Sequence, residues 1–185
     1  KGNLYYQPGD RFIDAKFFPN AKINVAENLL ANVDGVAIVA ILEDGTRSEI
    51  TYAQLRQRSA AVAAAMRQMG IVAGDRVVAW APNVPEVMIY ALGALSIGAI
   101  VSTASPDFAP NAVEDRFGQV SPKLILLADS YQYGGKTFDL QEKSAEIISL
   151  LPTLEKSVRI SEFESWIAPF IGADLEFNRL PFDHP

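Results

Sequence analysis

A glycine pair beside a lysine is the clearest local sign of a ligand contact in this sequence. Gly134-Gly135 precedes Lys136, and Tyr131 and Tyr133 stand just before the pair. Glycine lets a backbone approach a ligand closely, lysine supplies a cation, and a tyrosine ring can stack on a base. The pattern indicates a phosphate or nucleotide contact. A plain glycine turn with a solvated lysine is the simpler interpretation when nothing else is known, so both stay open here.

Two aspartates, Asp107 and Asp129, are candidates for the same neighbourhood. Each aspartate alone is better explained as the cap of a helix or turn, because a short carboxylate readily accepts bonds from nearby backbone N–H groups.

Residue types exclude several chemistries. The chain has no cysteine, and its one histidine is His184, so thiolate zinc sites, disulfides and a Ser-His-Asp triad are poor expectations. Neither G-x-x-x-x-G-K-[ST] nor G-x-G-x-x-G occurs. The sequence therefore offers candidate ligand-binding residues but no complete set of catalytic residues.

Composition favours one folded domain of 185 residues, 49% of them hydrophobic. The net charge of −6 opposes binding to a phosphate backbone, so nucleic acid is not an expected partner. The chain opens Lys1-Gly2-Asn3 without a methionine, and we interpret it as part of a longer protein. The absence of cysteine fits a cytoplasmic location.

Residues 87–106 carry no charge over a length that could just cross a bilayer. Acidic residues flank the stretch, Gly98 divides it, and β-branched residues follow the break. We therefore expect a buried helix followed by a buried strand, and no membrane partner.

Hydrophobic periodicity places the elements that must carry these residues. Helices are expected from Asn24 to Leu30, from the capping box Thr51-x-x-Gln54 to Gly70, from Asn83 with Glu86 to Gly98, over 110–120, from Asp139 to Leu151, and from Ser161-x-x-Glu164 to Ile171. Strands are expected over 36–42, 48–50, 76–81, 99–103 and 124–128, the first two joined at Asp44-Gly45.

The alternation of strands and helices predicts an α/β fold with a mostly parallel sheet flanked by helices on both faces. In such sheets, ligands collect beyond the carboxyl ends of the strands. Three loops are expected there: Pro82-Asn83, 102–108 and 129–136.

Residues 17–30, F-F-P-N-A-K-I-N-V-A-E-N-L-L, resemble the W-F-x-G-x-x-L-N-x-A-E-N-L-L opening of acetoacetyl-CoA synthetases, within the adenylate-forming acyl-CoA synthetase superfamily. The resemblance covers nearly the whole chain and is weakest over the first dozen residues and around 157–161, where we expect a missing strand. Further matches in order are Thr51-Tyr52 with Leu55, 74–78, Pro82-Asn83, 96–99, Ser105-Pro106-Asp107-Phe108, 115–117 and Tyr133-x-Gly135-Lys136.

Residues 180–185 resemble the segment directly before the family's phosphate-binding loop, S-S-G-T-T-G-x-P-K. The resemblance thus implies a truncated N-terminal subdomain over 24–185. The turn signals Pro8-Gly9-Asp10 and Pro19-Asn20 indicate an extended N-terminal arm over 1–23 that packs on this subdomain. The implied parent is an AMP-forming acid–CoA ligase that uses acetoacetate, ATP, CoA and Mg²⁺. Its catalytic residues would lie downstream, so the resemblance implies that the fragment is inactive alone. It also implies that the remainder of the chain is a binding partner, and that the apolar surface where this remainder docks is exposed in the fragment.

CoA-binding residues can be carried over at two places. In related acetyl-CoA synthetases a basic pair spaced R-x-x-R touches CoA phosphate, and the matching positions are Tyr133 and Lys136. A loop near CoA matches Ser105, Pro106 and Asp107, although that loop is glycine-rich in the acetyl enzymes. Arg116 fits the family's D-R-F and is expected to bond a helix end or Asp107.

Two other functions remain open. One is a free-standing α/β module that binds a nucleotide or CoA without catalysis, which the missing phosphate loop favours. The other is an unrelated flavodoxin-like or receiver domain. It is the weaker, because only Asp129 sits where receiver chemistry wants its acidic cluster.

Overall fold

The computed structural model describes residues 4–30 and 33–185 and is built on a four-stranded parallel sheet in the order β11-β8-β6-β7. The strands are β6 (Arg76–Trp80), β7 (Ile100–Ala104), β8 (Leu124–Leu127) and β11 (Lys156–Arg159). From β7 the chain crosses to the other side of β6 to form β8. Val78 at the centre of β6 is in register with Ser102 on one side and Ile125 on the other.

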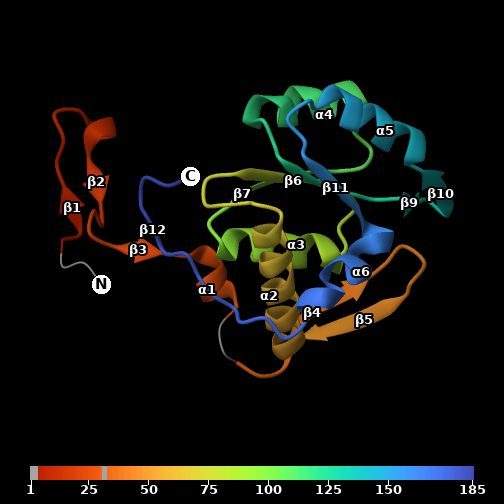
Figure 1. Cartoon of the computed structure of the whole chain (residues 1–185), viewed down its shortest axis with the longest axis horizontal. Helices are drawn as coiled ribbons and strands as arrows, with labels where there is room; N and C mark the ends of the chain where they lie inside the picture. The colour runs from red at the N-terminus through yellow and green to blue at the C-terminus, as the bar shows by residue number, and fades with distance from the viewer. Residues whose placement is uncertain (1–3, 31–32) are drawn as a thin grey trace.

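Helices cover both faces of this sheet, as expected (Figure 1). On one face lie α2 (Tyr52–Gln68), α3 (Pro85–Ser96) and α6 (Phe163–Ile167); on the other lie α4 (Pro110–Phe117) and α5 (Gln141–Leu150). Alternate strand residues point to opposite faces. Accordingly Val77 and Ala79 belong to the first apolar core, and Val78 and Trp80 to the second.

The first predicted strand lies outside the parallel sheet. It forms β4 (Val36–Ile41), which among residues 4–30 and 33–185 pairs with β5 (Arg47–Thr51) alone, in an antiparallel hairpin. The turn is at Asp44-Gly45 as predicted, with Gly45 at φ +83° and the Asp44 carboxylate accepting from the Thr46 N–H. The Thr51 and Gln54 capping box then starts α2.

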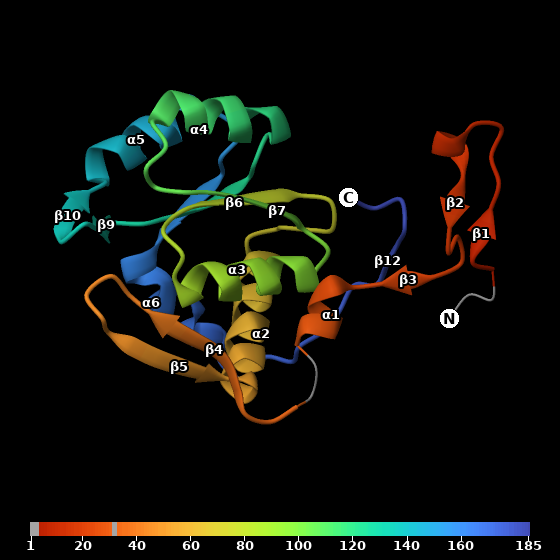
Figure 2. The same cartoon turned by 180° about the vertical axis from the view of Figure 1, so that it is seen from behind.

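The arm forms short paired segments along residues 4–23. They are β1 (Tyr6–Gln7), a 3₁₀ turn (Phe12–Asp14), β2 (Lys16–Phe17) and β3 (Lys22–Ile23). β1 pairs with β2 in a hairpin that lies to one side of the sheet and its helices (Figures 1 and 2), and β3 pairs with β12 (Leu180–Pro181). The hairpin meets the other end of the chain where the Phe17 and Phe182 rings lie 6.3 Å apart. Residues 1–3 lie outside the described residues.

Three predicted helix starts, at Asp139, Asn83 and Ser161, are wrong. Residue Asp139 ends a strand, because β9 (Ser130–Tyr133) and β10 (Lys136–Asp139) pair across Gly134-Gly135, whose positive φ angles (56° and 74°) suit a tight hairpin turn. Helix α5 follows it, and Asp139 accepts from the Gln141 N–H at 2.7 Å. Helix α3 has Val84 as N-cap with no side-chain bond. Pro85 opens it, since the missing N–H of proline costs nothing in the first turn.

The last segment also differs from the prediction. The strand expected to be missing is present as β11, paired with β8. The single helix expected to Ile171 is broken into a 3₁₀ turn (Ile160–Glu162), α6 and a second 3₁₀ turn (Ala168–Phe170) containing Pro169. Ser161 does not cap it; its N–H donates to the Asp129 carboxylate instead.

The uncharged stretch 87–106 contains most of α3 and all of β7, as predicted. Among the described residues, no helix combines the length and apolarity needed to span a bilayer.

Candidate functional site

The three predicted loops follow β6, β7 and β8, and therefore lie at one edge of the sheet. Loops leave β6 and β8 toward opposite faces, which opens a crevice between the two strand ends. An open cavity of about 700 Å³ lies there, lined by Pro82–Val84 and Ser130–Gln132. Its third wall, Ile41–Asp44, comes from the β4–β5 turn. Sequence reasoning missed that wall, because nothing local shows where a separate hairpin packs.

Tyr133 and Lys136 are brought together by the β9–β10 hairpin. They are directly opposite partners in its register, so their side chains share one face at neighbouring positions. Tyr133 is 68% exposed and Lys136 is exposed. A phenol and an ammonium so placed can contact one anion from adjacent positions.

Tyr131 has a different place from the one expected. Its ring stacks on Phe138 with centroids 5.0 Å apart and planes at 17°. The ring thus packs against its own hairpin, although Tyr131 also lines the cavity. This stack stabilises the strands that carry Tyr133 and Lys136.

Ser105, Pro106 and Asp107 form the turn that follows β7. The Phe108 N–H donates to the Ser105 carbonyl at 3.2 Å; Pro106 is buried, while Ser105 and Asp107 are exposed. This turn and the β9–β10 hairpin follow strands on opposite sides of β6, roughly 10 Å apart across the sheet at the usual strand spacing. The two groups share an edge but are not brought into contact.

Arg116 and Asp129 both have structural partners. The Arg116 guanidinium lies over the Phe108 ring at 4.5 Å from its centroid, rather than on a helix end or Asp107. One Asp129 oxygen accepts from the Ser161 N–H at 3.0 Å, and the other lies 3.5 Å from Arg159. Asp129 therefore joins the ends of β8 and β11, as the turn-cap interpretation favoured.

The described residues also lack a set of ligands for the Mg²⁺ implied by the resemblance. Within residues 4–30 and 33–185, no group of three or more His, Asp or Glu side chains could hold a metal ion.

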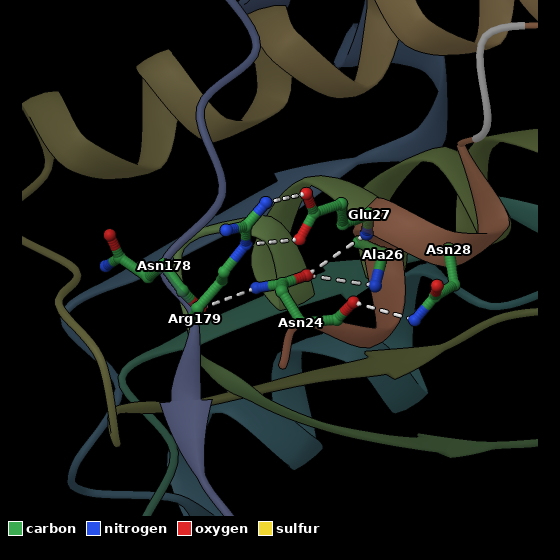
Figure 3. Close-up of polar contacts among 6 residues, drawn as sticks. All are labelled: Asn24, Ala26, Glu27, Asn28, Asn178 and Arg179. Atoms are coloured by element: carbon green, nitrogen blue, oxygen red, sulfur yellow. Dashed lines mark hydrogen bonds and ion pairs between the residues drawn. The ribbon is translucent and has the colours of Figure 1, made fainter. Parts of the chain in front are cut away.

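Asn24 and Glu27, from the segment that resembles the family's opening, hold Asn178 and Arg179 near the other end of the chain (Figure 3). We call these four residues the clamp. Asn24, 5% exposed, caps α1 (Val25–Leu29) by accepting from the Ala26 and Glu27 N–H groups. Its amide nitrogen donates to Leu95 O and Asn178 O, both at 2.8 Å, and lies 3.1 Å from Ser96 O. One side chain thus joins three elements distant in sequence.

An ion pair closes the clamp. Arg179 donates to both carboxylate oxygens of Glu27, at 2.8 and 2.5 Å. These hydrogen bonds hold the pKa of Glu27 below its ordinary value. The Asn178 side chain also donates to Ile97 O at 2.8 Å, and His184 Nε2 lies 3.0 Å from Gly98 O. Residues 178–184 are thereby fixed on the end of α3.

Comparison with known proteins places this fold in one family. The model of the family described as "AMP-binding enzyme" matches residues 26–172. The chain is 40% identical to acetoacetyl-coenzyme A synthetase of Rhizobium meliloti over 96% of its length and 38% identical to acetoacetyl-CoA synthetase of Mus musculus over all of it. It spans only 30% and 32% of those relatives.

Solved structures agree. Acetoacetyl-CoA synthetase from Streptomyces lividans matches all of the chain with a TM-score of 0.92 at 32% identity, and the chain covers 30% of it. A Brucella canis acyl-CoA synthetase matches 90% of the chain with a TM-score of 0.72 at 27% identity. The chain has the architecture of the N-terminal part of the acyl-CoA synthetase fold, and it belongs to the family of AMP-binding enzymes.

Proposed function

We propose that this chain is the N-terminal part of an AMP-forming acid–CoA ligase that converts acetoacetate, ATP and CoA to acetoacetyl-CoA, AMP and pyrophosphate. The observation that carries the proposal is the match to acetoacetyl-CoA synthetases along nearly the whole chain, in sequence and in fold. The proposal includes an α/β subdomain over 24–185 after the arm at 1–23. It also includes a cytoplasmic location, which the lack of cysteine favours.

The proposed reaction has two steps. A carboxylate oxygen of acetoacetate attacks the α-phosphorus of ATP, forming acetoacetyl-AMP and releasing pyrophosphate. The CoA thiol, having lost its proton, then attacks the acyl carbon, a thioester forms, and AMP leaves. Mg²⁺ and the groups that act on the reacting atoms are proposed to lie in the parent outside this chain, which spans only 30% and 32% of the relatives it matches.

The contribution proposed for this chain is contact with CoA. Lys136 supplies a positive charge for a CoA phosphate, and Tyr133 beside it donates a hydrogen bond or stacks on the adenine. The turn Ser105–Asp107 would contact CoA from the other side of the β6 end. Exposure of Tyr133, Lys136, Ser105 and Asp107 supports these roles.

The activity test compares the parent enzyme with this chain alone. We expect acetoacetate-dependent AMP formation by the parent, and no acetoacetate-dependent exchange of pyrophosphate into ATP by the purified chain. Exchange catalysed by the chain would contradict the assignment of adenylation to the remainder. A parent without acetoacetate-dependent AMP formation would contradict the substrate.

The CoA contact has its own variant. Lys136→Ala in the parent should raise the KM for CoA about tenfold, the loss of one charge-assisted hydrogen bond, and leave pyrophosphate exchange unchanged. Lys143→Ala is the matched control, because Lys143 is an exposed lysine on α5. An unchanged KM for CoA in Lys136→Ala would remove Lys136 from the site.

A further inference from the structure

The carbonyl groups at the end of α3 bind residues from both ends of the chain. Four successive oxygens take part, those of Leu95, Ser96, Ile97 and Gly98. Their partners are, in that order, the Asn24 side-chain amide, the backbone N–H of Asn178, the side-chain amide of Asn178, and His184 Nε2, at 2.8, 2.8, 2.8 and 3.0 Å. Residues 178–184 are therefore held on this helix end at both of their limits.

Packing restrains the middle of the same segment. Gly98 has φ +81°, and a Cβ built there would lie 2.6 Å from Leu180 Cδ1. The Leu180 side chain thus occupies space that any residue other than glycine at position 98 would fill. Leu180 is also in register with Ile23, where β12 pairs with β3. Hydrogen bonds, a close side-chain contact and a strand pair therefore all act on residues 178–184.

The ion pair of the clamp adds orientation more than stability. The side chains of Arg179 and Glu27 are 61% and 32% exposed, and ion pairs so exposed contribute little to the free energy of unfolding. Two parallel hydrogen bonds from one guanidinium to one carboxylate nevertheless fix both the distance and the angle between the groups (Figure 3). Removing the pair should therefore loosen residues 178–184 without unfolding the protein.

The clamp lies at the opposite end of the sheet from the β9–β10 hairpin and its candidate CoA contacts. Helix α3 starts beside the end of β6 and returns to the start of β7, so residues 178–184 lie at the edge where the strands begin (Figures 1 and 2). The chain has the architecture of the N-terminal part of its fold, and the groups that act on the reacting atoms are proposed to lie outside it. The parent chain would continue toward those groups from Pro185, directly after the clamped segment.

We propose that Glu27 and Arg179 are positioning residues for the adenylation of acetoacetate, because their ion pair fixes the segment from which the chain continues to the reacting groups. This proposal rests on the proposed function, because it needs the parent enzyme. A displacement of about 1 Å at the reacting atoms can lower a rate about 100-fold.

Kinetics of the full-length parent test the positioning role. Partial loosening in Arg179→Ala should lower the kcat of acetoacetate-dependent pyrophosphate exchange about tenfold. The KM for CoA should not change, since its proposed contacts lie at the other end of the sheet. Arg11→Ala is the matched control and should keep the wild-type kcat, because Arg11 also donates to both oxygens of one carboxylate, that of Asp14, at 2.8 Å, but only three residues away.

A double variant shows whether the two residues act as a pair. Glu27→Ala alone, and Glu27→Ala combined with Arg179→Ala, should each lower kcat by the same factor of about ten as Arg179→Ala, because each change removes the same ion pair. The urea unfolding midpoints of these variants should stay close to that of the wild type. The backbone N–H of Asn178, which donates to Ser96 O, should exchange with solvent about tenfold faster in Arg179→Ala than in Arg11→Ala.

The outcomes separate this proposal from the proposed function. An unchanged kcat in Arg179→Ala of a parent that catalyses the exchange overturns the positioning role and leaves the function intact. The same holds for a loss of kcat that Arg11→Ala shares, that grows to about 100-fold in the double variant, or that disappears when kcat is calculated per folded molecule. A wild-type parent that does not catalyse the exchange removes the proposed function, and this proposal with it, before any variant is compared.

Discussion

Replacing Asn24 by alanine should destabilise the chain more than any helix cap alone explains. The side chain accepts two N–H bonds at the start of α1 and donates to carbonyl groups at the end of α3 and at Asn178. Three carbonyl oxygens lie within 3.1 Å of its nitrogen, but an amide has two hydrogens. The Asn24 amide therefore donates two strong hydrogen bonds, to Leu95 O and Asn178 O.

Asn24→Ala should lower the free energy of unfolding by about 3 kcal/mol. An N-cap contributes about 1 kcal/mol, and each of the two donor bonds contributes about 1 kcal/mol net. Burial of Asn24 keeps water from replacing them fully. At a urea m-value of about 2 kcal/mol/M, the unfolding midpoint should fall by about 1.5 M.

Two further variants separate the cap from the donors. Asn28→Ala is the control: it removes the same type of side chain from the same helix, where the Asn28 amide makes a hydrogen bond of 3.4 Å to Asn24 O. It should cost under about 0.5 kcal/mol. Asn24→Asp keeps the cap but turns a carboxylate toward carbonyl oxygens, so it should be at least as damaging as Asn24→Ala at pH 7. If Asn24→Ala were as stable as Asn28→Ala, or Asn24→Asp as stable as the wild type, the hydrogen bonds of Asn24 would not contribute the expected free energy of unfolding.

Two other predictions concern packing and pH. Gly93→Ala should lower the free energy of unfolding in urea by about 2 kcal/mol, because the new Cβ would lie 2.4 Å from Val62 Cγ1 where α2 and α3 cross. Gly118→Ala is the control and should not destabilise the protein, because its Cβ would lie 4.0 Å from its nearest neighbour. Equal stabilities of the two variants would refute the close contact at Gly93. The lowered pKa of Glu27 means that its bond to Arg179 stabilises the fold above the ordinary pKa of 4.5 and is lost as pH falls through the lower folded value. Stability should therefore fall more steeply below about pH 4.5 in the wild type than in Glu27→Gln; parallel pH profiles would show that the pair contributes nothing.

The fold was readable where local and global signals agree. The all-apolar run 124–127 is a central strand buried on both faces, and the Thr51 capping box starts α2 as predicted. In both cases a short pattern has one physical meaning: a strand with no polar face must be covered twice, and a reciprocal cap satisfies N–H groups that only a helix start leaves free.

The β9–β10 hairpin was missed although its signal is local. Gly134-Gly135 was recognised as a site for backbone approach, but a glycine pair between two four-residue segments rich in Tyr, Thr and Phe is also a hairpin signal. Treating Asp139 as a helix start hid the second strand. The hairpin matters for the site, because it alone makes Tyr133 and Lys136 cross-strand neighbours.

The clamp could not be read from the sequence, because its bonds are not local. Asn24 and Asn178 are 154 residues apart, and Glu27 and Arg179 are 152 apart. Locally, Asn24 is fully explained as a helix cap, and no pattern around Asn178 announces a partner. The structure shows why an asparagine suits the position better than serine or aspartate. Those could cap α1 equally well, but an aspartate carboxylate has no hydrogen to donate and a serine hydroxyl has one, whereas the amide donates both to Leu95 O at the end of α3 and to Asn178 O.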